Sequence, residues 1–513
     1  MFAAIQIPDD WTPDLVRGAL GAGFHIGPVR SLGIVFLDTF DWRLATRGAR
    51  LWHESASDRR VLRWSSHPDH PTYTIPVDNQ PLKADDLPDG ILKTTVAPLL
   101  GHRALTDAGS CRIRRHVAGI RDRHGNSRVH IYLERINILA PSGKPFGSRL
   151  SLARVSGLPG LERPFNHAVD RLSSLHPHGK EQVDLLEIAV AARGRTVGDY
   201  SSRFRLTLSP GQSSESALRS IHLELLGKVL ANVDGTVRDL DIEFLHDLRV
   251  ACRRTRSALT KVKGVFPKNR IAPFTAEFKW LGQVTGPCRD LDVQLRDIER
   301  HQRAHPKLKE PLEPILHVIE NARARAQEDV SAALRSARFK ELTHDWEVFL
   351  RRPAKGNPPA RAGRPIRETA SYQILKAHRR VVQRGECLGE NPPADTMHRL
   401  RIDAKNLRYL LEFFRSLYAE KKVDRLIKEL KVVQNALGTI NDMHVQQDRL
   451  QEFAQELSST RGIQPTTLSA VKHMAAACKE RQKRARRNFK GHVETLISPA
   501  SRDRYTSLFE TEV

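Results

Sequence analysis

Two stretches of the chain each carry one histidine and three cationic side chains at the same spacing. The residues fall at positions i, i+3, i+7 and i+10, which lie on one side of an α-helix at 100° per residue. We call them the first ladder, His246, Arg249, Arg253 and Arg256, and the second ladder, His398, Arg401, Lys405 and Arg408. Such a row can bind a row of anionic oxygens, because arginine holds phosphate bidentately and lysine acts as a point charge.

The two ladders belong to a longer internal repeat. Their first residues are 152 positions apart, and the same offset relates further pairs without a gap over more than forty residues. These pairs are Lys279 and Lys431, Gly286 and Gly438, Asp290 and Asp442, and Val293 and Val445. Agreement without drift over this length indicates the duplication of a structural unit.

An apolar stripe runs beside each ladder, with the a/d spacing of a helix packed in a bundle. The stripe is Leu245, Leu248, Cys252, Thr255 and Leu259 in the first repeat, and Met397, Leu400, Ala404, Leu407, Leu411 and Phe414 in the second. We therefore expect each helix to bury one edge and to present its cations along the next edge.

The cations could also form an ordinary solvated helix face, and for a single basic helix we would favour that interpretation. Here the ladder recurs at matched positions, and few acidic residues stand at i+4 to pair with it. Helices whose surface charges serve stability usually alternate in sign, and these do not. The pattern therefore favours cations that bind a ligand.

His246 and His398 could be core histidines, metal ligands or contacts to a bound ligand. A metal site would need further His, Cys or carboxylate side chains at ligand spacing, and we expect none nearby. We predict that each histidine orients the neighbouring arginine by a hydrogen bond or contacts the ligand directly. Asp290 and Asp442 each follow a glycine by four residues, at an expected helix start. Helix capping or pairing with a basic residue is the role we favour for them over catalysis.

Composition narrows the class of partner. The formal net charge of +24 over 513 residues calls for a polyanionic partner or an anionic surface, and residues 211–513 carry +17 of it. The five scattered cysteines lack any CxxC pairing, which favours a reducing compartment over a disulfide framework or a zinc ribbon. There is neither a run of 18 apolar residues nor a signal-peptide pattern, so we expect a cytoplasmic protein without a membrane span.

Periodicity and turn signals predict a multidomain α+β chain. Residues 1–210 alternate as short strands between Gly, Pro and Asp turns, which indicates a β-rich domain. Helical periodicity then predicts two repeats of about four helices each, at 211–350 and 366–500. The Pro- and Gly-rich segment 351–365 cannot continue a helix and is expected to link them. A late basic cluster at 481–487 suits either polyanion binding or a solvated face.

The paired His-x-Leu-Arg-[Val/Ile]-x-x-[Arg/Lys]-x-x-Arg helices, each followed 44 residues after the histidine by an aspartate, resemble the CHAD family, the conserved histidine α-helical domain. The resemblance covers about residues 215–495. It implies a duplicated four-helix bundle with pseudo-twofold symmetry and a basic surface or central channel. It also implies binding of inorganic polyphosphate and association with polyphosphate granules. The implied contacts are His246, Arg249, Arg253, Arg256, Lys279, His398, Arg401, Lys405, Arg408 and Lys431.

The segment from Phe36 to Gly48, which contains Asp38, Thr39 and Asp41, resembles the "DTPD…RL…G" segment of CYTH domains. That family implies an antiparallel β tunnel, or barrel-like domain, that binds or hydrolyses triphosphate substrates with a divalent metal. The Glu-x-Glu-x-Lys strand of the family is absent, since the chain starts Phe-Ala-Ala-Ile-Gln-Ile after Met1. Mg²⁺ needs carboxylate ligands, so we expect a degenerate and inactive domain.

Some features of the N-terminal part could still serve a triphosphate site. Glu134 and Asp122 could restore metal binding, and basic residues remain on predicted strands. These basic residues are Arg60, Arg63, Arg112, Arg114 and Arg115. Mg²⁺ or Mn²⁺ would be needed only if this domain is active, and we expect no cofactor otherwise.

Three functions follow from these observations. The first is a non-enzymatic polyphosphate-binding protein. The second is a triphosphate or tripolyphosphate hydrolase that uses the N-terminal domain. The third is a basic protein associated with nucleic acid, which the low aromatic content of 6% disfavours, because single-stranded nucleic acid is usually bound by stacking on aromatic side chains.

Overall fold

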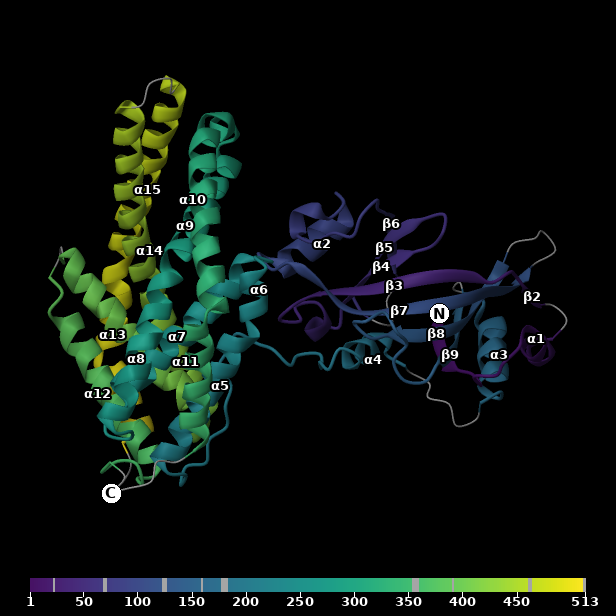
Figure 1. The fold of residues 1–513 in the computed structure, drawn as a ribbon, viewed down its shortest axis with the longest axis horizontal. Coiled ribbons are helices and arrows are strands. Elements are labelled where there is room, and N and C mark those ends of the chain that lie inside the picture. The colour runs from purple at the N-terminus through teal and green to yellow at the C-terminus, as the bar shows by residue number, and fades with distance from the viewer. Residues whose placement is uncertain are drawn as a thin grey trace. The chain divides into compact units, whose positions relative to one another are not determined.

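The computed structural model describes residues 1–21, 24–67, 72–121, 127–157, 160–176, 183–352, 359–389, 392–459 and 464–510. It divides into two compact units, Met1–Ser202 and Arg203–Val513. The predicted boundary at residue 210 lies in the same connecting segment as this division, between α4 (Leu185–Ala191) and α5 (Ser214–Ala231). An N-terminal unit built on a sheet followed by an all-helical unit is the predicted fold class, which is confirmed (Figure 1).

The N-terminal unit is built on one antiparallel sheet. Its strand order is β1-β9-β8-β7-β3-β4-β5-β6, with β2 paired to β7. Among the described pairings none joins β1 to β6, so the sheet is an open half-barrel rather than a closed tunnel. The strands are β1 Phe2–Gln6, β2 Phe24–Ile26, β3 Arg30–Thr39, β4 Arg50–Ser55, β5 Arg60–Ser65, β6 Tyr73–Pro76, β7 Leu105–Arg121, β8 Ser127–Leu139 and β9 Leu150–Gly157.

Short helices pack on this sheet. They are α1 Pro13–Leu20, α2 Ile91–Leu100, α3 Glu162–Ser173 and α4, with the 3-10 turns η1 Ala45–Arg47 and η2 Ala84–Asp86. In α3, the residues at i, i+3 and i+7, Phe165, Ala168 and Leu172, are buried against residues of β8 and β9. Amphipathic spacing of this kind is what predicts a helix lying on a sheet.

The second unit consists of two helical repeats. The first contains α5, α6 Val233–Val237, α7 Ile242–Lys261, α8 Lys268–Val284, α9 Gly286–Ala304, η3 Pro306–Leu308, α10 Lys309–Arg335 and α11 Ala337–Arg351. The second contains α12 Ile366–Glu386, α13 Ala394–Phe413, η4 Arg415–Leu417, α14 Glu420–Ser459, α15 Pro465–Ile497 and α16 Pro499–Phe509. Helices α12, α13 and α14 begin 152 residues after α5, α7 and α8, which is the offset of the sequence repeat. Of the predicted linker 351–365, residues 353–358 lie outside the described residues.

One difference between the repeats concerns α14. The continuous α14 corresponds to two helices, α8 and α9, which are separated at Thr285. Pro287 stands just after this break, where the second repeat has Thr439. Because proline has no N–H, it cannot donate to the carbonyl of Gln283, and its ring clashes with that turn. A single proline therefore interrupts the helix in one repeat only.

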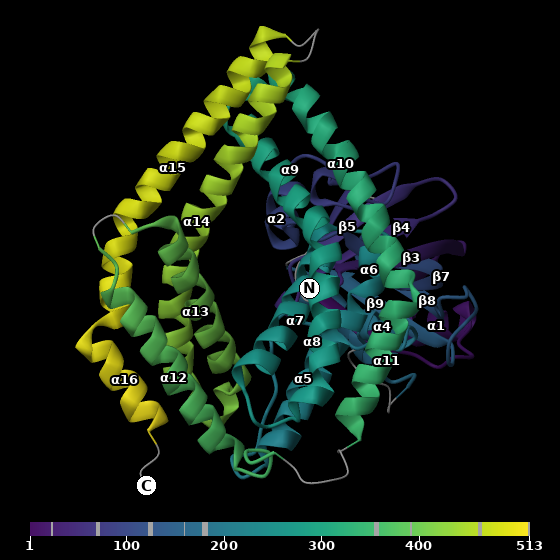
Figure 2. The same ribbon diagram turned by 60° about the vertical axis from the view of Figure 1, so that its left-hand side comes forward.

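The two repeats meet in three places. Equivalent residues Ser213 and Pro365 form an isolated antiparallel bridge, as expected at a pseudo-twofold axis. Helices α7 and α13 pack against each other, and α10 packs against α15 near the far ends of the repeats (Figure 2). At that far end Ile298 and Leu312 of one repeat share a small apolar core with Met443 and Met474 of the other.

All residues of the two predicted apolar stripes are buried, which confirms the edge of α7 and of α13 that faces the core. All five cysteines are free, and Cys387 is the exposed one. Within the described residues no helix is both long enough and apolar enough to cross a membrane.

Candidate functional site

The ladder helices α7 and α13 start in different ways. The side chain of Asp241 caps α7 by accepting from the backbone N–H groups of Glu243 and Phe244, whereas Pro393 precedes α13. Both helices bury their apolar stripe, which places the ladder on the next edge. The eight ladder side chains are exposed or half-buried, with Arg253 and His398 the exposed ones.

In the first ladder, Arg249 is fixed at the break between α8 and α9. Its guanidinium donates to the carbonyl oxygen of Gly282 at 2.9 Å and to Oγ1 of Thr285 at 2.8 Å. Burial lowers the pKa of Arg249, and repulsion from Arg253 acts in the same direction, while attraction to Asp290 opposes both. Asp290 is thus close enough to Arg249 to act on its charge, as the favoured pairing role predicts.

In the second ladder, the equivalent Arg401 pairs with a carboxylate instead. Its guanidinium lies 3.2 Å from Oδ1 of Asp442, the residue equivalent to Asp290. The pairing role of Asp442 is therefore confirmed, whereas its expected place at a helix start is wrong, because it lies inside the uninterrupted α14. The proline of the first repeat accounts for this difference.

Arg408 ends the second ladder with two partners. Its guanidinium donates to Oε1 of Gln434 and to Oε1 of Glu412, both at 2.7 Å. Glu412 stands at i+4 from Arg408, so the expectation that few acids at i+4 pair with the ladders does not hold at this residue. Arg401 and Arg408 are thus partly neutralised. Among the described residues no carboxylate forms an ion pair with Arg253, Arg256 or Lys405.

The helix next to each ladder carries a glycine that lies beside a ladder arginine. A Cβ atom built on Gly286 would lie 3.6 Å from the guanidinium of Arg249, and one built on Gly438 would lie 3.8 Å from that of Arg401. A Cβ atom at either position would make an ordinary van der Waals contact, so each glycine lies next to the matched arginine. Lys279 and Lys431 precede these glycines by seven residues, on the same helical stripe, and both are exposed. Each lysine thus lies on the helix next to its ladder, two helical turns before the glycine.

The two ladders converge where α7 packs against α13. Nε of Arg253 in the first repeat donates to the hydroxyl of Tyr409 in the second at 3.0 Å. Lys405 lies beside Arg253, Arg401 and Arg408. Burial and repulsion from these three cations lower the pKa of Lys405 to about 8, against the attraction of Asp442. Cations from both repeats therefore form one positive patch.

The two histidines have unlike surroundings. We expected no carboxylate ligands near His246, and this is wrong, because Glu243 and Asp247 place ligand atoms within 4.8 Å of it and of each other. His398 lines a small cavity of about 30 Å³ together with Arg401, His444 and Arg486. Arg486 belongs to the basic cluster 481–487, so that cluster reaches the second ladder through this residue.

Some residues of the patch escaped sequence analysis. The side chains of Tyr409, Gln434 and Thr285 each bond a ladder arginine. The side chains at the equivalent positions of the other repeat are of different types: Ser257, Gly282 and Leu437. A residue that acts in one copy only does not recur at the repeat offset, so the repeat pattern did not predict these partners.

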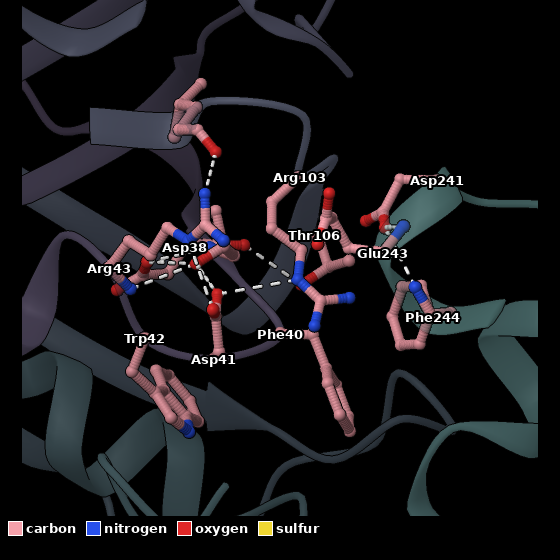
Figure 3. A network of polar contacts seen from close by, with 12 residues as sticks. Asp38, Phe40, Asp41, Trp42, Arg43, Arg103, Thr106, Asp241, Glu243 and Phe244 are labelled. Carbon is pink, nitrogen blue, oxygen red and sulfur yellow. Dashed lines mark hydrogen bonds and ion pairs between the residues drawn. The ribbon is translucent and has the colours of Figure 1, made fainter. Parts of the chain in front are cut away.

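In the N-terminal unit, the Asp38–Asp41 segment forms a polar turn (Figure 3). The buried carboxylate of Asp38 accepts from the backbone N–H groups of Thr39, Leu44 and Ala45 at 2.7 to 3.0 Å. Burial raises the pKa of Asp38, against these hydrogen bonds. Asp41 accepts from Oγ1 of Thr39 and from Nε of Arg43. The segment that resembles CYTH domains thus holds a turn together.

The acidic residues on the sheet are occupied by arginine. Glu134 is fully buried and lies 2.7 Å from Nε of Arg115 and 3.1 Å from Nε of Arg154. Glu54 on β4 pairs with Arg63 at 3.0 Å. Both carboxylates are thus paired with arginine, while Oε2 of Glu134 accepts no hydrogen bond from the described residues. Asp122, the other suggested metal ligand, lies outside the described residues.

Comparisons with known proteins bear mainly on the helical unit. The family model of the CHAD domain matches residues 220–451. Two curated Mycobacterium tuberculosis proteins, both described as uncharacterized, are 28% identical over 224 residues, which is 42% of this chain and 42% of theirs. The match therefore spans less than half the length of those relatives.

Solved structures overlap with each part of the chain. The CHAD domain from the plant Ricinus communis is 25% identical, with a TM-score of 0.48, and covers 58% of this chain and 98% of its own. PptA from Streptomyces chartreusis is 17% identical, with a TM-score of 0.43, over 55% of this chain and 99% of its own. A putative adenylyl cyclase from Hippeastrum, described with a dominant triphosphatase activity, is 16% identical, with a TM-score of 0.29, over 37% and 95%. The family model of the CHAD domain therefore matches a part of the helical unit of this chain.

Proposed function

We propose that the protein binds inorganic polyphosphate through the patch formed by the two ladders. The observation that carries this proposal is the convergence of Arg253 from one repeat with Arg401 and Lys405 from the other. Burial is the main cause of the lowered pKa of Lys405, and repulsion from Arg401 and Arg253 adds to it, so holding these charges together costs free energy in the absence of a counter-anion. A linear polyanion would neutralise all of them at once.

The chemistry of the patch suits phosphate oxygens better than nucleobases. Arginine and lysine side chains make up the two ladders, and the single aromatic partner, Tyr409, is buried and cannot stack on a base. Polyphosphate carries about one negative charge per internal phosphate and offers only oxygens, so rows of N–H donors are what it requires. Through this binding the protein would associate with polyphosphate granules.

Titration of the full chain with fluorescently labelled long-chain polyphosphate, followed by anisotropy, tests the proposal. Replacing Arg249, Arg253, Arg401 and Lys405 together by alanine should weaken binding more than tenfold. A control variant with Arg300, Arg338, Arg351 and Arg425 replaced by alanine has the same net charge but loses only peripheral ion pairs. Affinity in this control should stay within about threefold of the original, since exposed pairs contribute little.

Competition defines specificity. Unlabelled polyphosphate should displace the probe at lower charge concentration than heparin or single-stranded DNA, and affinity should fall steeply with salt, by analogy with counterion release from DNA. Equal competition by all three polyanions, or an equal loss in both quadruple variants, would show that only net charge matters and would contradict the proposal.

A further inference from the structure

A second positive site lies away from the ladders. A cavity of about 130 Å³ lies between the C-terminal end of α7, α12 and α13, and its cationic lining residues are Lys261, Lys263, Arg361, Lys376 and Arg380. Among the residues that line it, the one carboxylate is that of Asp403. Oδ2 of Asp403 already accepts from Nε of Arg384 at 2.7 Å. The cavity therefore has a large excess of positive charge.

This cavity is distinct from the ladder patch. On α13 it is lined by Asp403, Asn406 and Leu410, a stripe with i, i+3, i+7 spacing. At 100° per residue, Asn406 is turned about 100° and Asp403 about 160° from Lys405 of the second ladder. The cavity thus opens on a different side of α13 from the cations proposed to bind polyphosphate.

Comparison of the two repeats explains why the space exists. In one half of the pseudo-twofold arrangement, Arg254 and Glu412 fill the equivalent place with an ion pair 2.5 Å long. The residues at the matching positions, 152 residues away, are Asn406 and Thr260, and both line the cavity. Two shorter, uncharged side chains replace a filled ion pair, so a space remains among the surrounding cations.

The lining also presents unused donors. Nδ2 of Asn406 is buried and has no hydrogen-bond partner, while its Oδ1 atom accepts from the hydroxyl of Ser257 at 3.1 Å. Burial lowers the pKa of Lys261, and repulsion from Arg380 and Lys263 adds to this effect, against the attraction of Asp403. An unpaired amide N–H and crowded ammonium and guanidinium groups are complementary to an oxyanion.

We infer that the cavity binds one phosphate group, either free inorganic phosphate or a phosphoryl group carried by a small molecule. With a volume of about 130 Å³, the cavity has room for several water molecules and hence for a single phosphate. Asn406 would donate to one oxygen, and Lys261, Lys376 and Arg380 would neutralise the charge. The inference goes beyond the proposed function, because it does not involve the ladders.

Calorimetric titration of the full chain with inorganic phosphate, pyrophosphate and a sugar phosphate tests this site. It also distinguishes free phosphate from a phosphoryl group carried by a small molecule. The exposed pair Lys376→Gln with Arg380→Gln should weaken binding of the preferred compound at least tenfold. The control pair Arg379→Gln with Lys422→Gln removes the same charge from exposed positions that do not line the cavity, and should change the affinity less than twofold. No saturable binding of any of the three compounds, or equal weakening in both pairs, would overturn the inference.

A substitution of nearly equal shape gives a second test. Asn406→Asp keeps the acceptor for Ser257 but places a carboxylate among the cavity cations, so it should abolish phosphate binding and raise the thermal midpoint of the protein. Arg253→Gln with Lys405→Gln, in the ladders, should leave phosphate binding unchanged. Retained phosphate binding in Asn406→Asp would refute the site, whatever the result for long-chain polyphosphate, so this failure is distinguishable from failure of the ladder proposal.

Discussion

Arg253 of the first repeat donates through Nε to the hydroxyl of Tyr409 in the second, at 3.0 Å. This bond joins the two ladders at the contact between α7 and α13, where their cations come closest. The ring of Tyr409 also lies under the guanidinium of Arg254, 5.6 Å from the ring centre. One buried tyrosine thus positions an exposed ladder arginine above it and supports a structural arginine beside it.

Tyr409→Phe removes only the hydroxyl that accepts from Arg253. Polyphosphate binding should weaken about three- to tenfold, because a net hydrogen bond of this kind is worth about 0.5–1.5 kcal/mol. Anisotropy titration measures the effect, and circular dichroism should show unchanged helix content. Tyr505→Phe, in which the buried hydroxyl removed has no hydrogen-bond partner, provides the control. An unchanged affinity in Tyr409→Phe would mean that Arg253 does not need this partner for binding.

The lowered pKa of Lys405 predicts a pH-dependent affinity. Polyphosphate favours the charged form of Lys405, whose pKa is about 8 in the free protein, so binding should be strongest below pH 8 and weaken as the pH rises to 9. Lys405→Arg keeps the charge over this range and should remove the dependence. Titrations at several pH values and constant ionic strength measure it, and an equally steep decline in Lys405→Arg would assign the effect to another group.

The ion pair between Arg254 and Glu412 is predicted to be structural. Both side chains are largely buried, and Glu412 also pairs with Arg408, so Glu412→Ala removes two ion pairs and should lower the free energy of unfolding by about 3–5 kcal/mol. Glu347→Ala removes the partner of Arg351 in an exposed pair and should cost less than about 1 kcal/mol. Urea unfolding of the three proteins compares them. Similar losses for both variants would show that burial of the Arg254 pair has no special weight.

Two buried histidines make the helical unit sensitive to acid. Burial lowers the pKa of His222 to about 3 and that of His378 to about 4, whereas both would titrate near 6.5 in the unfolded chain. Between these values the unfolded state binds more protons than the folded state, so stability should fall as the pH drops from 6.5 towards 4, by up to about 1.4 kcal/mol per pH unit for each histidine. His378→Phe should make the decline shallower in urea unfolding experiments, and an unaltered slope would contradict this assignment.

The N-terminal unit is predicted to lack triphosphate hydrolysis. Glu54 and Glu134 are held by arginines, which leaves no free carboxylate pair there for Mg²⁺ or Mn²⁺ among the described residues. Phosphate release from tripolyphosphate with either metal should match the rate without protein. Release that disappears in Glu134→Gln would establish an activity and contradict the expectation.

The sequence predicted well those features that depend on periodicity. The buried stripe from Leu245 to Leu259 and the ladder beside it follow from spacing alone, because a helix converts fixed spacing into fixed faces. Residues that act across the repeats were not predictable in this way. Arg253 and Tyr409 are 156 residues apart and have no shared pattern, so only their tertiary contact reveals the pair.

Differences between the two copies were not predicted either, because the repeat pattern consists of the residues that the copies share. Pro287 interrupts one helix, and at this break Arg249 donates to a backbone carbonyl. In the other copy, Arg401 pairs with Asp442 instead. The phosphate-sized cavity likewise arises where Asn406 departs from the Arg254 of the other copy. The segment that resembles CYTH domains forms a turn, in which the carboxylate of Asp38 accepts from backbone N–H groups. The resemblance therefore told us more about local structure than about catalysis.

The bridge between Ser213 and Pro365 joins positions that correspond in the two halves, and α7 and α13 are related in the same manner. A binding protein with two such halves offers equivalent contacts to a linear polymer bound in either direction. A single strand of DNA or RNA has a chemical direction and would be bound unequally by the two halves, whereas a chain of identical phosphates is the same from either end. The internal duplication therefore suits a polymer that lacks polarity.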